Sequence, residues 1–229
     1  MIRRDYILRM IEELIQVLAR IGSLKQSQRW QEASEALAGE LNRLTDLDPI
    51  ALCKLSDTEL LAKIVHGEPT MAVRDKTLGI ASLLKEAGDI LKATGKLADA
   101  RQAYLKGLHL LLHALCADDP LDVPAFVPKL DEFLMLLSDG PLPLGTHATL
   151  MHHYEQIGDY AKAEDALFNV LDAEPDNPQF LDFGLSFYQR LEMKPDSALS
   201  EGNLPRVELL DSIKELRERK DALLAAKAG

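Results

Sequence analysis

Apolar residues recur every three or four positions at the start of the chain. Over residues 5–21 this spacing, with charged residues between, predicts a strongly amphipathic helix whose apolar side carries Ile7, Met10, Ile11, Leu14, Ile15, Leu18 and Ile21. A second stripe, which includes Trp30 and Leu37, predicts another helix over residues 27–44. The two helices are close in sequence, so they are expected to form an N-terminal helical hairpin within residues 1–46.

Turn-forming residues divide the rest of the chain into further helices. Residues 47–55 are predicted to be a loop, and the capping box formed by Ser56 and Glu59 predicts a helix to about Val65. The later helices are predicted at about 70–94, 97–117, 123–137, 146–157, 160–173, 178–193 and 204–226, with a mobile stretch at 194–203. The Pro- and Gly-containing breaks are turns rather than linkers, so one all-α domain over residues 1–229 is expected.

Two segments of the chain align when one glycine in each is used as the anchor. Around Gly95 and around Gly158, small and large residues stand at the same offsets, and each glycine is suited to the positive φ that ends a helix. Small residues such as Gly88 and Ala100 are expected to let two antiparallel helices approach closely. A third, partial copy begins at Phe180, and its second helix departs from the pattern.

This pattern resembles the tetratricopeptide repeat, a helical hairpin of about 34 residues. The resemblance covers residues 80–193 and implies a right-handed superhelix of antiparallel hairpins, with irregular spacing between the copies. An unrelated helical bundle that uses the same small and large residues is the alternative. The stretch at residues 5–12, DYILRMIE, also resembles the start of a bacterial family of tetratricopeptide-like proteins of uncharacterised function, and this second resemblance implies no activity.

Composition narrows the classes of ligand. The net charge is −11 and the basic residues are interleaved with acidic ones, which disfavours binding to nucleic acid. No apolar run reaches the length of a membrane span, and charged residues interrupt the N-terminus where a signal peptide needs an apolar core. Cys53 and Cys116 form no paired framework. We therefore expect a soluble cytoplasmic protein that binds neither membrane nor nucleic acid.

One group of side chains suggests metal chemistry. His109, His113 and Cys116 recur at i, i+4 and i+7, so they share one side of a predicted helix and could offer three zinc ligands. The alternative is packing at the flank of an apolar stripe, which we favour because no acidic base accompanies them. The segment between Gly88 and Gly95 has the wrong spacing for a phosphate-binding loop. We expect neither a cofactor nor catalytic residues.

The resemblance implies a concave groove lined by the first helix of each hairpin. The groove positions that it implies are Lys85, Asp89, Lys92, His152, Glu155, Gln156, Leu185 and Tyr188. Some tetratricopeptide proteins hold a peptide carboxylate with Lys and Asn on this surface, and here Asp89 stands where Asn is expected. The groove could instead be filled by the terminal helix of the chain itself.

These observations favour a non-catalytic scaffold or adaptor that binds a protein or peptide. Two alternatives remain. The first is a self-associating protein that forms a homodimer through its N-terminal or C-terminal helix, and the second is a metal-dependent enzyme that uses His109, His113 and Cys116.

Overall fold

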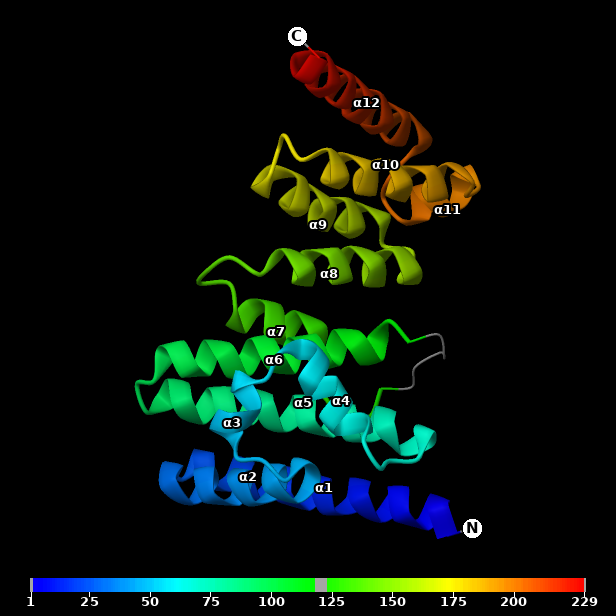
Figure 1. Ribbon diagram of the computed structural model, residues 1–229. Helices are drawn as coiled ribbons and strands as arrows, with labels where there is room; N and C mark the ends of the chain where they lie inside the picture. Colours follow the sequence, from blue (N-terminus) through cyan, green and yellow to red (C-terminus); the bar gives the residue numbers. More distant parts are fainter. Residues whose placement is uncertain (1, 118–122, 229) are drawn as a thin grey trace. The chain divides into compact units, whose positions relative to one another are not determined.

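The protein is built from α-helices. The structure, a computed structural model, describes residues 2–117 and 123–228, and no strand occurs among them (Figure 1). The helices are α1 (Ile2–Gln26), α2 (Trp30–Thr45), α3 (Pro49–Lys54), α4 (Asp57–Val65), α5 (Thr70–Ala93), α6 (Leu97–Leu115), α7 (Leu130–Leu136), α8 (Leu144–Ile157), α9 (Tyr160–Ala173), α10 (Pro178–Glu192), α11 (Asp196–Glu201) and α12 (Arg206–Ala228). None of these helices is long and apolar enough to cross a bilayer.

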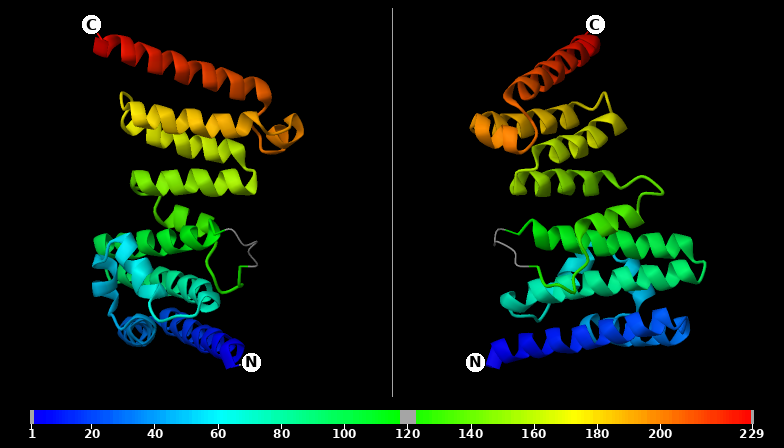
Figure 2. Two further views of the ribbon diagram at one scale, coloured as in Figure 1. Left: turned by 45° about the vertical axis from the view of Figure 1, so that its right-hand side comes forward. Right: turned by 180° about the vertical axis from the view of Figure 1, so that it is seen from behind.

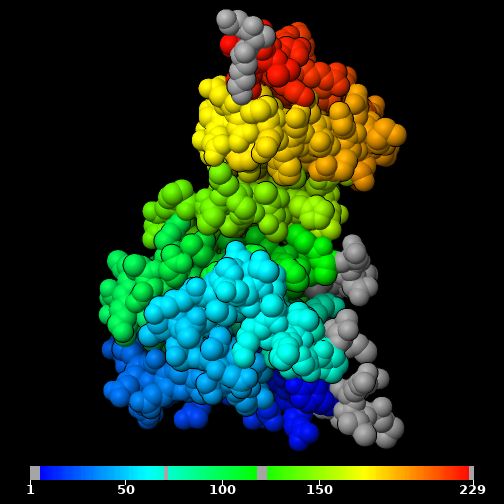
Figure 3. Space-filling model, viewed as in Figure 1, coloured from blue at the N-terminus to red at the C-terminus, as the bar shows by residue number. Residues whose placement is uncertain are grey.

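The helices form two compact units, residues 1–141 and 142–229. The first unit contains the hairpins α1–α2 and α5–α6, and α2 packs against α5. The short helices α3 and α4 cover one side of α5–α6, as the blue-to-cyan segment in Figure 3 shows. Helix α5 is therefore enclosed over most of its length, and its residues from Lys76 to Leu84 are all buried.

The second unit contains the α8–α9 hairpin, followed by α10, α11 and α12. Helix α12 packs along α10 through an apolar seam of Leu209, Ile213 and Leu216, all of them buried. The apolar seam of the last helix is therefore used inside this unit. Two further views of the helices are given in Figure 2.

Three hairpins turn in the same way. Gln28, Gly95 and Gly158 have φ of 57°, 80° and 81°, and the residues that follow them, Arg29, Lys96 and Asp159, have φ between −90° and −85°. In each turn the following residue donates its N–H to a carbonyl five residues back, over 2.9 Å: Arg29 to Leu24, Lys96 to Leu91 and Asp159 to Tyr154. This is the Schellman motif, which satisfies the carbonyls at a helix end.

The packing inside these hairpins follows the predicted small and large positions. Counted from the three turn residues, the same offset places Ala33, Ala100 and Ala163 in the core, and a later one places Leu37, Tyr104 and Leu167 there. A Cβ added to Gly88 would lie 2.7 Å from Cζ of Tyr104 and closer still to two other ring carbons, so only glycine leaves room for this ring. The N-terminal hairpin thus follows the same plan as the two copies recognised by their glycines.

Three predicted segments differ from the structure. The predicted loop at 47–55 contains α3, because Asp48 accepts a hydrogen bond from the Ala51 N–H and Pro49 fits the first helical position. The predicted helix at 123–137 is helical only as α7, because Pro124 and Pro128 disfavour helix in the residues before them. The stretch at 194–203 was predicted to be mobile and instead contains α11, which is anchored by the buried Leu199.

Candidate functional site

Two of the predicted groove positions, Lys85 and Asp89, lie in a group of charges that we term the α5 charge cluster: Lys25, Lys85, Glu86 and Asp89. Lys25 of α1 reaches across to α5, with its Nζ 2.6 Å from Glu86 and 2.5 Å from Asp89. Lys85 Nζ lies 3.0 Å from Asp89 and 3.3 Å from Glu86. The four side chains retain only about a fifth of their exposure, at 17–20%. The cluster holds two cations and two anions, so its charges balance.

The tyrosine that fills the space beside Gly88 completes this cluster. The Tyr104 hydroxyl donates a hydrogen bond to Asp89 over 2.9 Å. Burial alone would raise the pKa of Asp89, but the hydrogen bonds and charges of Lys25 and Lys85 outweigh burial and lower it. Lys85 shows the mirror effect: burial opposes its charge, while Asp89 and Glu86 raise its pKa. These groups are satisfied by one another, so an incoming carboxylate would have to displace them. Lys92, the third predicted groove position on α5, is exposed.

The predicted groove positions of the second unit lie on α8 and α10. Glu155 of α8 accepts two hydrogen bonds from the Arg190 guanidinium of α10, each 2.7 Å long, in a bidentate pair. The hydrogen bonds to Glu155 raise the pKa of Arg190, and burial lowers it by less. The pKa of Arg190 is therefore raised. We use the term α8–α10 face for this pair together with the other predicted groove positions on the two helices that are not fully buried, namely His152, Gln156 and Leu185.

The remaining members of the α8–α10 face differ in exposure. His152 and Gln156 are exposed and lie one helical turn apart, so they are next to each other along α8. Leu185 on α10 is half-buried. Glu155 occupies the position in its hairpin that Lys25 occupies in the first, three residues before the turn residue, and both side chains bridge to a helix of another part of their unit. The arrangement offers two exposed polar side chains on α8, on a helix that an ion pair links to α10.

Tyr188 does not line an open groove. It is fully buried, and its hydroxyl donates a 2.6 Å hydrogen bond to Glu164 of α9. The Ser212 hydroxyl of α12 donates to the same carboxylate over 3.0 Å. Leu216 of α12 lies beside Gly184, where an added Cβ would come 3.2 Å from its Cδ1. The terminal helix therefore covers this side of α10, which was the alternative left open for the groove.

The three metal-ligand candidates do not converge. His109 is half-buried with its Nδ1 3.5 Å from Asp57, which also binds Lys106 at 2.6 Å. His113 is exposed, and Cys116 is the residue that ends α6. Burial is the main cause that lowers the pKa of His109. Among the described residues no group of three or more His, Cys, Asp or Glu side chains is placed to hold a metal ion.

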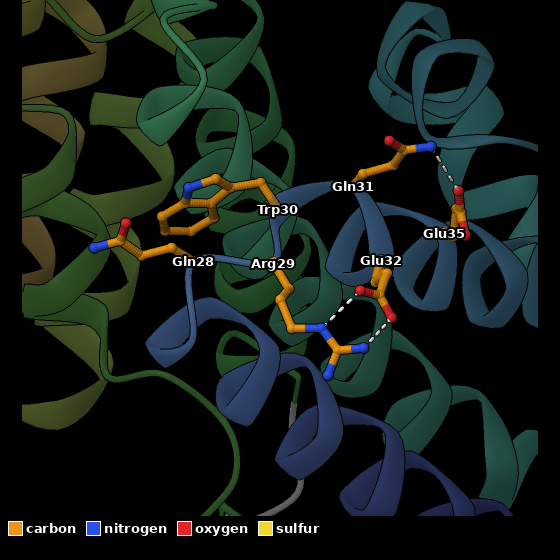
Figure 4. Close-up of a pocket in the computed structure, with 6 residues that line it drawn as sticks. All are labelled: Gln28, Arg29, Trp30, Gln31, Glu32 and Glu35. Carbon is orange, nitrogen blue, oxygen red and sulfur yellow. Dashed lines mark hydrogen bonds and ion pairs between the residues drawn. The ribbon is translucent and has the colours of Figure 1, made fainter.

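A shallow depression that the sequence did not suggest lies at the α1–α2 turn (Figure 4). It has a volume of about 490 Å³ and is lined by Gln28, Arg29, Trp30, Gln31, Glu32 and Glu35. Its polar walls are already paired, since Arg29 binds Glu32 and the Gln31 amide donates to Glu35 over 3.2 Å. A single Trp next to a turn is the one sequence signal that could have indicated it. The wall pairs leave few unpaired groups for a ligand to bind.

The chain belongs to a protein family described as a family of unknown function, DUF6483, whose model matches residues 1–221. A search of curated proteins found none that matches the sequence. Membership therefore extends over nearly the whole chain and assigns no chemistry to it.

Proposed function

We propose that this protein is a non-catalytic, cytoplasmic scaffold of tetratricopeptide type that binds a protein or peptide partner. The observation that carries the proposal is the recurring hairpin. Helices α1–α2, α5–α6 and α8–α9 share one turn geometry and one small-to-large packing scheme, which is the construction of repeat proteins whose stacked hairpins present a binding surface.

The α8–α10 face is the binding surface that we propose. Its positions on α8 are the exposed His152 and Gln156, and the Glu155–Arg190 pair links α8 to α10. A surface held rigid before binding loses little conformational entropy when a partner docks. Extended or helical peptides suit such a surface, because their backbone and side-chain groups can contact the exposed His152 and Gln156.

The α5 charge cluster is a weaker candidate for the same role. A carboxylate ligand would gain contacts with Lys25 and Lys85 only by displacing Glu86 and Asp89 from them. Breaking a half-buried pair leaves an uncompensated charge, which opposes the exchange. We therefore assign this cluster to stability and the α8–α10 face to binding.

Peptide display against the purified full-length chain tests the proposal. We expect selection to enrich peptides that bind the chain, and the double variant His152→Ala, Gln156→Ala to weaken the binding of these peptides by about tenfold or more, or about 1.4 kcal/mol. The matched control is Asp165→Ala with Asn169→Ala, two exposed residues one turn apart on α9. Peptides that bind both variants as well as the wild type, or a selection without enrichment, would contradict the proposal.

A further inference from the structure

Helix α1 exposes an apolar stripe along the side that does not face its own unit. Leu8 and Ile15 retain 51% and 45% of their exposure, and Ile11 and Leu18 are half-buried. At 100° per residue these four side chains fall within an arc of about 80°. The buried side of the same helix is formed by other residues, Met10, Leu14, Ile21 and Leu24. We term Leu8, Ile11, Ile15 and Leu18 the α1 stripe.

Helix α12, at the other end of the chain, is the terminal helix to which α1 can be compared. Helix α12 buries Leu209, Ile213 and Leu216. On its exposed side Lys214 and Arg217 stand between the exposed Leu210 and Leu224, so no continuous apolar stripe forms there. A terminal element with a polar outer side is what keeps a stack of helical hairpins soluble. The α1–α2 hairpin lies at the end of its unit (Figures 1 and 2), and its first helix carries the continuous α1 stripe. An exposed apolar surface of this kind marks an interaction site.

The order of residues in the α1 stripe indicates which partner covers it. The residues are Leu, Ile, Ile and Leu at spacings of three, four and three, so the stripe reads the same in both directions. Two antiparallel copies of α1 would place Leu8 opposite Leu18 and Ile11 opposite Ile15, and the reciprocal pairs follow by symmetry. A two-fold interface requires this self-complementarity, because each patch meets its own copy. Spacings of three and four also suit knobs-into-holes packing between helices.

We propose that two copies of this chain form an antiparallel homodimer through the α1 stripe. The stripe spans about 16 Å of helix, so the area that it buries falls below the roughly 1,200 Å² of a standard stable complex. The exposed Glu12 borders the stripe, and the pairing brings its two copies to the same side of the seam, which adds repulsion. The dimer is accordingly weak, with a Kd of about 1–100 μM. This inference is independent of the binding surface on α8 and α10.

Sedimentation equilibrium tests the dimer directly. The full-length wild type should shift from monomer to dimer as its concentration rises to about 200 μM, above the expected Kd. Ile15→Glu should weaken the association at least about tenfold, because it places a charge in the seam without touching the core. The control is Leu224→Glu, a leucine of α12 with the same 51% exposure as Leu8. A wild type that stays monomeric throughout, or a dimer that Ile15→Glu leaves intact, overturns the proposal.

Cross-linking tests the antiparallel pairing. A mixture of the Leu8→Cys and Leu18→Cys chains should form a disulfide between the two chains under mild oxidation, whereas Leu8→Cys alone should not. The wild type, with half-buried Cys53 and Cys116, reports the background, and burial raises the pKa of both native thiols. Efficient self-linking of Leu8→Cys would show a parallel pair and contradict the proposed pairing. Circular dichroism on each variant confirms that the helices are retained.

Discussion

Two carboxylates, one in each unit, accept a hydrogen bond from a buried tyrosine. They differ in their other partners, which are cations at one carboxylate and a hydroxyl at the other. Asp89 receives the Tyr104 hydroxyl together with Lys25 and Lys85. Glu164 receives the Tyr188 and Ser212 hydroxyls, and no cation pairs with it among the described ion pairs. At Asp89 burial favours a raised pKa, but the hydrogen bonds and charges of Lys25 and Lys85 outweigh it and lower the pKa. At Glu164 burial is the dominant effect and raises the pKa.

The difference shows two ways to join neighbouring helices through a polar group. In the first unit a balanced set of charges links α1 to α5, and it depends on the carboxylate being ionised. In the second unit hydroxyl groups link α9, α10 and α12 around a carboxyl group whose ionised form is disfavoured by burial. We term these two sets of contacts the Asp89 joint and the Glu164 joint. Their stability should respond differently to substitution and to acid.

Substitution of Gly88, beside the Tyr104 ring, has the largest expected effect. Gly88→Ala should lower the stability of the first unit by about 2–3 kcal/mol, because the added methyl overlaps the Tyr104 ring and overpacking of this kind is not relieved by a flexible chain end. The measurement is the free energy of unfolding in urea, with hydrogen exchange of α5 and α6 to locate the change.

Gly184→Ala is the matched control. Its new methyl would lie 3.2 Å from Leu216 and 3.5 Å from Leu167, contacts that need only small shifts of side-chain ends. The gain of about 0.5–1 kcal/mol from replacing a helical glycine should offset this crowding. Equal destabilisation by both substitutions would contradict the assignment of Gly88 to close packing.

Much of the helical pattern could be predicted because it follows from local chemistry. The capping box at Ser56 and Glu59 is present, and the glycines at 95 and 158 adopt the expected positive φ. The third turn was harder to recognise, because Gln28 adopts the same left-handed conformation without being a glycine. Turn chemistry that tolerates a non-glycine residue leaves no clear signal in one sequence.

The binding positions were predicted less well, for a physical reason. The resemblance placed Lys85, Asp89 and Tyr188 on an open surface, whereas their partners Lys25, Glu164 and Ser212 come from helices distant in sequence. Local periodicity tells which side of a helix a residue occupies and not what covers that side. Exposed His152 and Gln156 show the opposite case, because nothing in the sequence distinguished them from Tyr188.

Isosteric substitution of the two carboxylates should change stability in opposite directions. Asp89→Asn removes the charge that Lys25 and Lys85 share and should cost about 1–2 kcal/mol, since hydrogen bonds to charged groups are stronger than neutral ones. Glu164→Gln keeps an oxygen for the Tyr188 and Ser212 hydroxyls and removes a buried charge, so it should stabilise the second unit by at most about 1 kcal/mol at pH 7. Urea unfolding of both variants measures the two signs, and a loss of stability in both would contradict the comparison.

Mild acid is expected to have the smallest effect on stability. It should change the stability of the contacts around Glu164 and leave those around Asp89 unchanged. The folded-state pKa of Glu164 lies above its ordinary value of 4.5, so its contribution to stability is fully present below that value and is lost as the pH rises through the folded-state pKa. The pKa of Asp89 lies below its ordinary 3.8, so its contribution is retained above that value. Hydrogen exchange corrected for intrinsic rates should therefore show α12 better protected at about pH 4.5 than at about pH 7, with α5 unchanged at the Asp89 joint.

Glu164→Gln serves as the control for this pH effect. The nearby acidic side chains Asp165, Glu208 and Glu215 remain in that variant, so a gain in α12 protection that persists without Glu164 must come from them. A gain that disappears assigns the effect to Glu164. Protection of α12 that falls on acidification in the wild type would mean that the ionised carboxylate stabilises the joint, and the contrast between the two units would then be one of geometry rather than of charge.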